Sequence, residues 1–394
     1  MSPVAGSRPG TLPAVFMRGG TSNALMLRRA DVPGDLAAWA PVFLSAMGSP
    51  DPYGRQLDGM GGGVSSLSKI CVVAPSERPD ADLDYTFVQV AVREGRIDLS
   101  GNCGNMLAAV GPFGIDAGLV SAADGPVRLR IHNTNTGKLI EASFAVRDGR
   151  TVYAGDLAIP GVAGTGAPIR LDFRDPGGAT TGRLLPTGRT RDRLDVPGLG
   201  AVEVSLVDAA NACAFVRAAD LGLAGTEPSA ALEAVPGLLD RLARIRVAAS
   251  VAMGIARDPA EAAGIAHVPF IGLVAPPRDA ATLSGAPVRA DAVDLTARVI
   301  SNGLPHQALP LTATLCLAVA ARLEGSLVHE AVRTTAAART TEDALRVGMP
   351  SGILTADAAV TRGPDGWRAT RGAFFRTARP LMRGEVFYDV PPPG

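Results

Sequence analysis

Short apolar stretches separated by turn-forming residues make up most of this 394-residue chain. Their spacing predicts a buried strand at "KICVV" (69–73), two strands within 83–100, a hairpin around "NTNTGK" within 125–146 and two strands within 195–216. With 46 Gly and 31 Pro, much of the rest is expected to be turn and loop. Fewer segments have a helical period, and we expect helices at about 34–47, 104–118, 229–256, 306–323 and 326–336.

Two distant segments share one order of elements. "GRIDLSGNCGNMLAAVGPFGIDAGLV" (95–120) and "TARVISNGLPHQALPLTATLCLAVAARL" (296–323) each predict a strand, a tight turn and a helix. The strands end at Ser100 and Ser301, which are 201 positions apart, about half of the chain. The pattern suggests two similar domains, each sending a strand toward the N-terminus of a central helix.

The predicted domain limits follow from this repeat. Residues 1–185 are expected to form the first domain and 186–375 the second. The strand-like closing segment 376–394 is expected to return to the first domain. The polar, turn-rich segment 171–198 is the best candidate for the crossing between them.

Composition excludes several classes of protein. Hydrophobic residues make up 47% of the chain and charged residues 19%, which is typical of a well-buried globular protein. A formal net charge of zero argues against a nucleic-acid or anionic-membrane partner, because both recruit a basic surface. No apolar run approaches the roughly 18 residues of a membrane span. The first ten residues lack an apolar signal core, so we expect a cytoplasmic protein.

The cysteines and histidines show no metal-ligand spacing. Cys71, Cys103, Cys213 and Cys316 form no CxxC pair, so the sequence signals neither a disulfide framework nor a zinc site. The four histidines are equally scattered, and we predict no metal. Cys71, Cys213 and Cys316 lie in apolar strings and are expected in the core.

Cys103 has a different setting from the other cysteines. It lies in "SGNCGNMLAAVG" (100–111), between glycines and asparagines at the start of a predicted helix. Unpaired N–H groups and the helix dipole make such a position favourable for carboxylates and for an ionised thiol. Cys103 is therefore a candidate for proton transfer. In the second domain, the corresponding helix start is expected to carry His306.

Lysine is rare in this chain. Of 38 Lys and Arg residues, only Lys69 and Lys138 are lysines. Lys69 follows the glycine- and serine-rich stretch "DGMGGGVSSLS" (58–68), whose backbone N–H groups and hydroxyls can approach a ligand closely. Because the lysine enters a strand instead of opening a helix, a nucleotide-binding phosphate loop is not predicted. Lysine loses its proton more readily than arginine when buried, so Lys69 is a candidate base.

A set of ordered motifs resembles the PrpF family over nearly the whole chain. That family has a diaminopimelate-epimerase-like fold, and the motifs are "MRGGTSNA" (17–24), "MGGGVSSLSK" (60–69), "GNCGN" (101–105), "HNTNTGK" (132–138), "DAANACAFV" (208–216), "LPHQALPLT" (304–312) and "RTARPLMRGEVFY" (376–388). The resemblance implies an α+β fold of two similar domains, each a β-barrel-like, mostly antiparallel sheet wrapped around a central helix. It also implies an active site in the cleft between the domains.

The resemblance implies an activity as well. Family members are cofactor-independent isomerases of unsaturated di- and tricarboxylates, including methylaconitate, methylitaconate and aconitate isomerases and 4-oxalomesaconate tautomerase. The family's catalytic lysine and cysteine fall on Lys69 and Cys103. One departure is that Asn23-Ala24 stands where the first motif commonly has Lys-Gly. The expected partner is a small polycarboxylate, and a homodimer stays open as the assembly.

The residues around these motifs are the predicted site. A base would remove a proton from carbon conjugated to a carboxylate, and an acid would return one at the other end of the allylic system, with preorganised donors stabilising the charge. Lys69 and Cys103 are the predicted proton carriers, in either order. The predicted substrate-binding residues are Arg18, Gly19, Gly20, Thr21, Ser22, Ser66, Ser68, Asn102, Gly104, Asn105, Ser301, Asn302 and His306.

Two other function classes stay open at this point. A two-base amino-acid racemase or epimerase on the same fold would usually have a thiol at both helix starts. A non-catalytic carboxylate-binding protein would need the anion site but no titratable pair.

Overall fold

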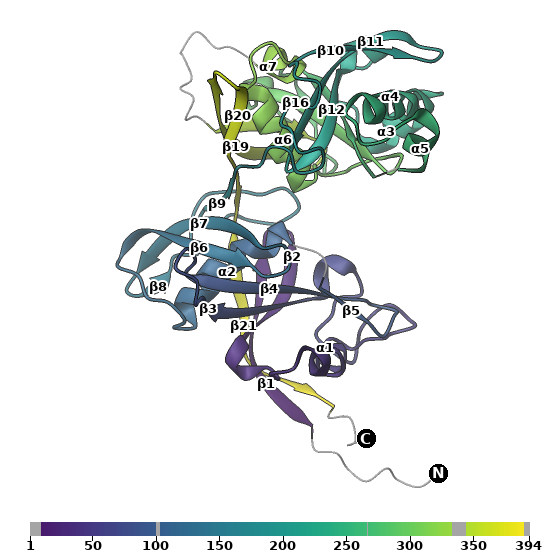
Figure 1. Ribbon diagram of the computed structural model, residues 1–394. Helices are drawn as coiled ribbons and strands as arrows, with labels where there is room; N and C mark the ends of the chain where they lie inside the picture. Colours follow the sequence, from purple (N-terminus) through teal and green to yellow (C-terminus); the bar gives the residue numbers. More distant parts are fainter. Residues whose placement is uncertain (1–8, 100–102, 266, 333–343, 390–394) are drawn as a thin grey trace. The chain divides into compact units, whose positions relative to one another are not determined.

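The computed structural model describes residues 9–99, 103–265, 267–332 and 344–389 (Figure 1). These residues form two compact units. Unit 1 comprises the chain up to residue 171 together with residues from 375 onward, and unit 2 is Asp172–Phe374. The strands β9 (Ile169–Arg174) and β20 (Gly366–Arg376) contain the two points at which the chain passes between units. The predicted limits at 185 and 375 stay a prediction.

Unit 1 is built on eight strands in the order β21–β1–β2–β3–β4–β6–β7–β8. The neighbours are antiparallel except for the parallel pairs β2–β3 and β4–β6, and the short β5 pairs with β4. Its strands are β1 (Gly10–Gly19), β2 (Ser22–Arg28), β3 (Lys69–Pro75), β4 (Leu83–Val90), β5 (Ile97–Asp98), β6 (Gly125–Asn133), β7 (Lys138–Arg147), β8 (Arg150–Thr151) and β21 (Ala378–Tyr388). Its helices are α1 (Trp39–Met47), α2 (Gly104–Asp116) and the 3-10 turns Arg29–Asp31, Leu36–Ala38 and Ser65–Leu67.

The sheet of unit 1 wraps around α2. This helix contacts β1, β2, β3, β4, β6, β7, β8 and β21. Ten of its thirteen residues are buried, from Met106 to Ile115, because the sheet surrounds it. On the other face of the sheet, α1 packs Trp39 and Phe43 into a cluster with Leu25 and Ile70. The sheet is therefore covered by helices on both faces, and α2 lies on its concave side.

Unit 2 repeats this topology. The order β10–β11–β12–β13–β16–β18–β19 has parallel pairs at β12–β13 and β16–β18 and antiparallel pairs elsewhere. Its strands are β10 (Asp192–Val196), β11 (Gly200–Ala209), β12 (Asn211–Arg217), β13 (Phe270–Ala275), β14 (Ala280–Ala281), β15 (Pro287–Val288), β16 (Leu295–Ser301), β17 (Leu304–Pro305), β18 (Leu345–Met349) and β19 (Gly352–Gly363). Its helices are α3 (Ser229–Ala234), α4 (Leu238–Ala252), α5 (Pro259–Gly264), α6 (Leu311–Arg322), α7 (Leu327–Ala331) and the 3-10 turns Ala218–Leu221 and Ala290–Ala292.

The two units correspond element by element. In each, a central helix joins the same two strands: α2 lies between β4 and β6 in the chain, and α6 between β16 and β18. In each, the parallel crossover carries the outer helices, α1 in unit 1 and α3 to α5 in unit 2. The predicted α+β class, with a mostly antiparallel sheet around a central helix in two similar halves, is confirmed.

Two predicted helices have different limits in the structure. The expected helix 229–256 is divided, because Gly237 adopts a positive φ of 66° at the start of α4 and Pro236 precedes it. The expected helix 306–323 begins only at Leu311, with Pro310 as its N-terminal cap. Pro305 lies in β17, since a residue before proline disfavours helical φ/ψ and two prolines flank this segment. His306 is therefore not the start of the second central helix.

Candidate active site

A folded loop, residues 51–68, leads to Lys69. Gln56 is buried in it with a φ of 52°, and its side-chain N–H donates to Ser49 Oγ at 2.8 Å. Its Oε1 accepts from Gly63 N at 2.9 Å and Ser68 Oγ at 2.6 Å. Asp51 accepts three backbone N–H groups nearby, which lower the pKa of its carboxyl. The glycine- and serine-rich stretch is thus held in place by side-chain hydrogen bonds.

Lys69 is the first residue of β3 and is only 6% exposed. Its Nζ donates to the carbonyl oxygen of Ser65. The same carbonyl accepts from Gln89 Nε2 at 3.0 Å, and Gln89 lies opposite Lys69 in the β3–β4 ladder. Burial lowers the pKa of Lys69, because the charged amine loses water, and the negative charge of an ionised Cys103 opposes this lowering. Cys103 therefore lies close enough to Lys69 for a charge on the thiol to affect the amine.

Cys103 is half-buried and caps α2. Its φ of −121° and ψ of 98° are extended, and its carbonyl accepts from Leu107 N at 3.1 Å. No side-chain hydrogen bond from the thiol to the helix is formed. Cys103 is thus the N-terminal cap residue of α2, at the end of the helix where unpaired N–H groups and the positive end of the dipole favour negative charge.

Two further titratable groups lie next to this pair. Cys71 and Tyr85 are fully buried, and Cys71 Sγ lies 3.8 Å from Tyr85 Oη. Burial raises the pKa of both, and an ionised Cys103 raises them further. Both stay neutral at ordinary pH, so Cys71 is a core cysteine, as the sequence predicted.

The β1–β2 turn packs directly against the first turn of α2. It has two residues, Gly20 and Thr21, with Gly19 opposite Ser22. A Cβ on Gly20 would lie 2.3 Å from Asn105 Oδ1, and Gly20 has a φ of 52°. Asn105 Nδ2 donates to Thr21 Oγ1 at 3.1 Å. Glycine is needed here for both conformation and space.

Arg376 joins this contact from the far end of the sequence. It is buried, and its Nε donates to Asn105 Oδ1 at 3.1 Å while Nη1 donates to Phe375 O at 2.8 Å. Burial lowers its pKa to about 10, so the guanidinium keeps its charge at neutral pH. A cation thus lies against the N-terminus of α2, near the position of Cys103.

Arg18 forms hydrogen bonds to backbone carbonyl oxygens at the same turn. Its Nη1 donates to Gly20 O at 2.9 Å and Thr377 O at 3.0 Å, and Gly20 N donates to Thr377 O. Burial, and to a smaller extent Arg379, lowers its pKa. The structure therefore gives Arg18 a role in holding the turn, and its contact with substrate stays a prediction.

The serines of the loop differ in exposure. Ser68 is fully buried and bonded to Gln56 and to Val64 O, so its hydroxyl supports the loop. Ser66 is half-exposed in the 3-10 turn. Ser22 is buried at the start of β2, and Gly104 opens α2. Asn102 lies outside the described residues.

In unit 2, three predicted residues form one cluster. Ser301 Oγ lies 2.6 Å from His306 Nε2, and the turn between β16 and β17 consists of Asn302 and Gly303, both with positive φ. An Asn-Gly pair of this kind is typical of a type I′ hairpin turn. Burial lowers the pKa of His306. A common site of this cluster with Lys69 and Cys103 stays a prediction.

Sequence reasoning missed Gln56, Gln89 and Arg376. Gln56 and Gln89 carry no local signal, since each acts through contacts that only the folded loop creates. Arg376 is the first residue of the motif "RTARPLMRGEVFY", and its place in this motif is the signal by which the sequence could have indicated it.

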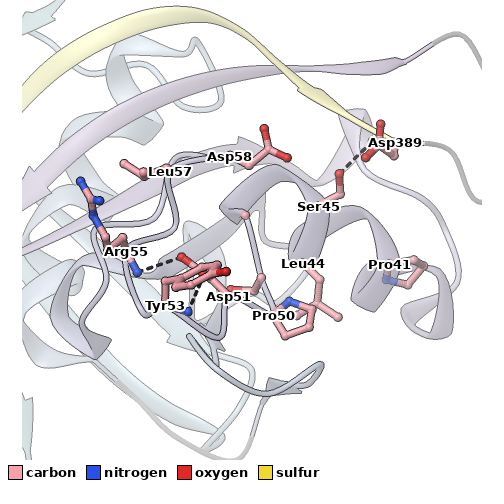
Figure 2. A pocket seen from close by; sticks show the side chains of 12 residues that line it. Pro41, Leu44, Ser45, Pro50, Asp51, Tyr53, Arg55, Leu57, Asp58 and Asp389 are labelled. Carbon is pink, nitrogen blue, oxygen red and sulfur yellow. Dashed lines mark hydrogen bonds between the residues drawn. The ribbon is translucent and has the colours of Figure 1, made fainter.

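A cavity of about 790 Å³ lies elsewhere in unit 1, between α1 and residues 48–58 (Figure 2). Its lining includes neither Lys69 nor Cys103. Within the described parts of the chain, no group of three or more His, Cys, Asp or Glu residues is arranged to hold a metal. No helix of those parts is long and apolar enough to cross a membrane.

A family model described as "PrpF protein" matches residues 10–389. The chain belongs to the PrpF family. It is 40% identical over 380 residues to 3-methylitaconate isomerase of Eubacterium barkeri, a match that covers 96% of this chain and 97% of the relative. It is 37% identical over 391 residues to 2-methyl-aconitate isomerase of Shewanella oneidensis, with the same coverage. The resemblance found in the sequence motifs is confirmed, and the protein is an isomerase.

The fold agrees with a solved structure in this family. A crystal structure of methylitaconate-delta-isomerase superposes with a TM-score of 0.88 and 39% identity over 97% of each chain.

Proposed function

We propose that this PrpF isomerase moves a double bond, or rotates it between cis and trans, in an unsaturated di- or tricarboxylate of the methylitaconate, methylaconitate, aconitate or oxalomesaconate type, without a cofactor. The observation that carries the proposal is the pair Lys69 and Cys103. A nearly buried amine with a lowered pKa lies within electrostatic reach of a thiol at a helix N-terminus. Relatives named for methylitaconate and methylaconitate support this substrate class.

In the proposed reaction two groups carry protons, and substrate and product have the same atoms. One carrier removes a proton from the allylic carbon, leaving the electron pair delocalised into the conjugated carboxylate. The other returns a proton at the far end of the three-carbon system, and the double bond moves by one position. If the proton returns to the original carbon after bond rotation, the product is the geometric isomer.

Charge on the carboxylate oxygens has to be stabilised by fixed donors. The unpaired N–H groups of the first turn of α2 and the positive end of its dipole are suited to this role. The buried Arg376 adds a full positive charge on the same helix end. Burial favours a neutral Lys69 next to this positive region, which is the state that accepts a proton.

The racemase alternative is less well supported. The helix start that corresponds to Cys103 in unit 2 is Pro310, which has no titratable group. A symmetric exchange between two thiols on equivalent helix starts is therefore not favoured by this chain.

Solvent exchange tests the proposal. In D₂O with each candidate acid, the wild type should place deuterium at the allylic carbon of one substrate and convert it, as followed by NMR. Cys103→Ser and Lys69→Ala should each lose isomerisation, and at least one should retain exchange at the carbon served by the surviving group. Full turnover in either variant would refute the mechanism, and exchange only at an amino-acid α-carbon would favour the racemase.

The two lysines provide a matched control. Lys69→Arg should be as inactive as Lys69→Ala, because a guanidinium does not release its proton near neutral pH. Lys138 is exposed at the start of β7, so the same substitution there should leave turnover almost unchanged.

A further inference from the structure

The strand β21 forms an edge of the unit 1 sheet. Its ladder partner is β1 (Figure 1). The pairing is regular from Met382, opposite Phe16, to Tyr388, opposite Gly10. Residues 379–385 are all exposed, although they belong to an eleven-residue strand. An exposed edge of this length can pair with another chain unless it is protected.

This edge carries large apolar side chains in water. Leu381 is 46% exposed, Met382 37% and Phe387 65%. Val386, between them, is buried in the cluster with α1. Pro380 and the register shift at Leu381 interrupt one end of the strand, so regular pairing is possible mainly over 382–388.

The charges on β21 are self-complementary. Arg379 and Arg383 precede Gly384, and Glu385 and Asp389 follow it. Within the described residues, none of these four has an ion pair of opposite charge. Arg383 donates to a backbone carbonyl at 3.3 Å, and Glu385 accepts from a threonine hydroxyl at 3.4 Å.

We propose that β21 is a homodimer interface, in which two copies pair antiparallel about a two-fold axis at Gly384. This register places Arg383 opposite the partner's Glu385. An axis one residue earlier would put Arg383 against its own copy, and one residue later would do the same for Glu385. Like charges directly opposite each other destabilise a ladder. Only the axis at Gly384 places both Arg383 and Glu385 opposite a residue of opposite charge.

The apolar residues fit the same register. Met382 lies opposite the partner's Val386, and the exposed Phe387 lies beside the start of the partner's regular strand. Because of the two-fold axis, each of these contacts occurs once on each subunit. Asp389 also lines the cavity of Figure 2, together with Asp51, Asp58 and one cation, Arg55, so the C-terminal end of β21, which lies beside the start of the partner's strand, is mainly acidic.

Charge reversal tests this register. Sedimentation equilibrium over a roughly hundredfold range of concentration should give the wild type a mass of twice 40.3 kDa at the upper end. Arg383→Glu and Glu385→Arg should each raise the dimer Kd at least about tenfold, because each creates a like-charge contact on both sides of the axis. The double variant Arg383→Glu/Glu385→Arg restores opposite charges and should restore the dimer.

Arg257→Glu is the matched control. Arg257 lies on an exposed turn of unit 2 with a side chain 87% exposed, and its reversal changes net charge by the same amount. It should leave the mass unchanged. A monomeric wild type, a dimer that survives both single reversals, or a double variant that stays monomeric would each overturn the proposal.

A cross-link provides a second measurement. Gly384→Cys places two thiols next to each other at the axis, and a short bismaleimide should join them into a covalent dimer. Gly34→Cys, in an exposed turn with open space around its Cα, should give no more cross-linking than the parent protein. Equal cross-linking of the two variants would contradict the proposed axis. Both measurements read mass, so they do not depend on the proposed function.

Discussion

Gly20→Ala should damage unit 1 more than an ordinary glycine substitution does. A Cβ at this position would lie 2.3 Å from Asn105 Oδ1 and 3.1 Å from Arg376 Cδ. Asn105 cannot move away without weakening its bonds to Thr21 and Arg376. The substitution therefore perturbs the contact that fixes the first turn of α2.

The expected magnitude has two parts. A non-glycine residue in the left-handed region, here at a φ of 52°, costs about 1–2 kcal/mol. Crowding in a packed interior typically adds about 1–3 kcal/mol. Gly20→Ala should thus lower the free energy of unfolding by about 2–5 kcal/mol. Gly118→Ala isolates the first part, since Gly118 has a φ of 70° and nothing within 4 Å of its Cβ position.

Tryptophan fluorescence measures unit 1 separately. The chain has two tryptophans, Trp39 in the core of unit 1 and Trp367 in unit 2. In a Trp367→Phe background, urea unfolding followed at Trp39 should show a larger loss for Gly20→Ala than for Gly118→Ala. Turnover of the folded fraction should fall only in Gly20→Ala. Equal stability losses in the two variants would refute the crowding argument.

Three further predictions concern titration and charge. The pH profile of kcat/KM should contain a limb with an apparent pKa below 10.5, the ordinary value of lysine, because burial lowers the pKa of Lys69. Any residual activity of Cys103→Ser should show this limb at lower pH, because the thiolate that raises the pKa of Lys69 is absent. Arg376→Gln should lower the urea stability of unit 1 by about 1.5–3 kcal/mol, the usual loss for a charged hydrogen bond, and should lower kcat more than Arg376→Lys does. Burial lowers the pKa of His306, so the unfolded state binds more protons than the folded state between that lowered pKa and 6.5. Stability should therefore rise with pH through this window. His306→Gln should remove this dependence, as measured by thermal unfolding at pH values on either side of the window.

Much of the fold could be predicted because its signals are local. The hairpin at 125–146 appears as β6 and β7, joined at Asn133 and Lys138, and "KICVV" lies in β3. Glycine, asparagine and proline mark these turns within a few residues of the strands they end. The repeat of strand, turn and helix is equally local, and it was enough to predict two similar halves.

The parts that were missed depend on contacts between distant residues. Arg376 and Asn105 are 271 positions apart, and neither carries a sign of the other in its local sequence. The start of α6 was placed too early because His306 follows the motif that resembles the first helix start. Pro310, the residue immediately before Leu311, sets the actual start of α6.

The correspondence between the units shows where the chemistry is concentrated. Lys69 is the first residue of β3, and the first residue of the corresponding β13 is Phe270. Cys103 caps α2, and Pro310 caps α6. The two proposed proton carriers thus both lie in unit 1, and the corresponding described positions of unit 2 hold residues that do not titrate. An inversion at one carbon needs two groups on opposite faces of it, and equivalent helix starts would supply them symmetrically. A shift along an allylic system involves two separated carbons, and two unlike groups can each serve one of them, which is the arrangement proposed for the pair in unit 1.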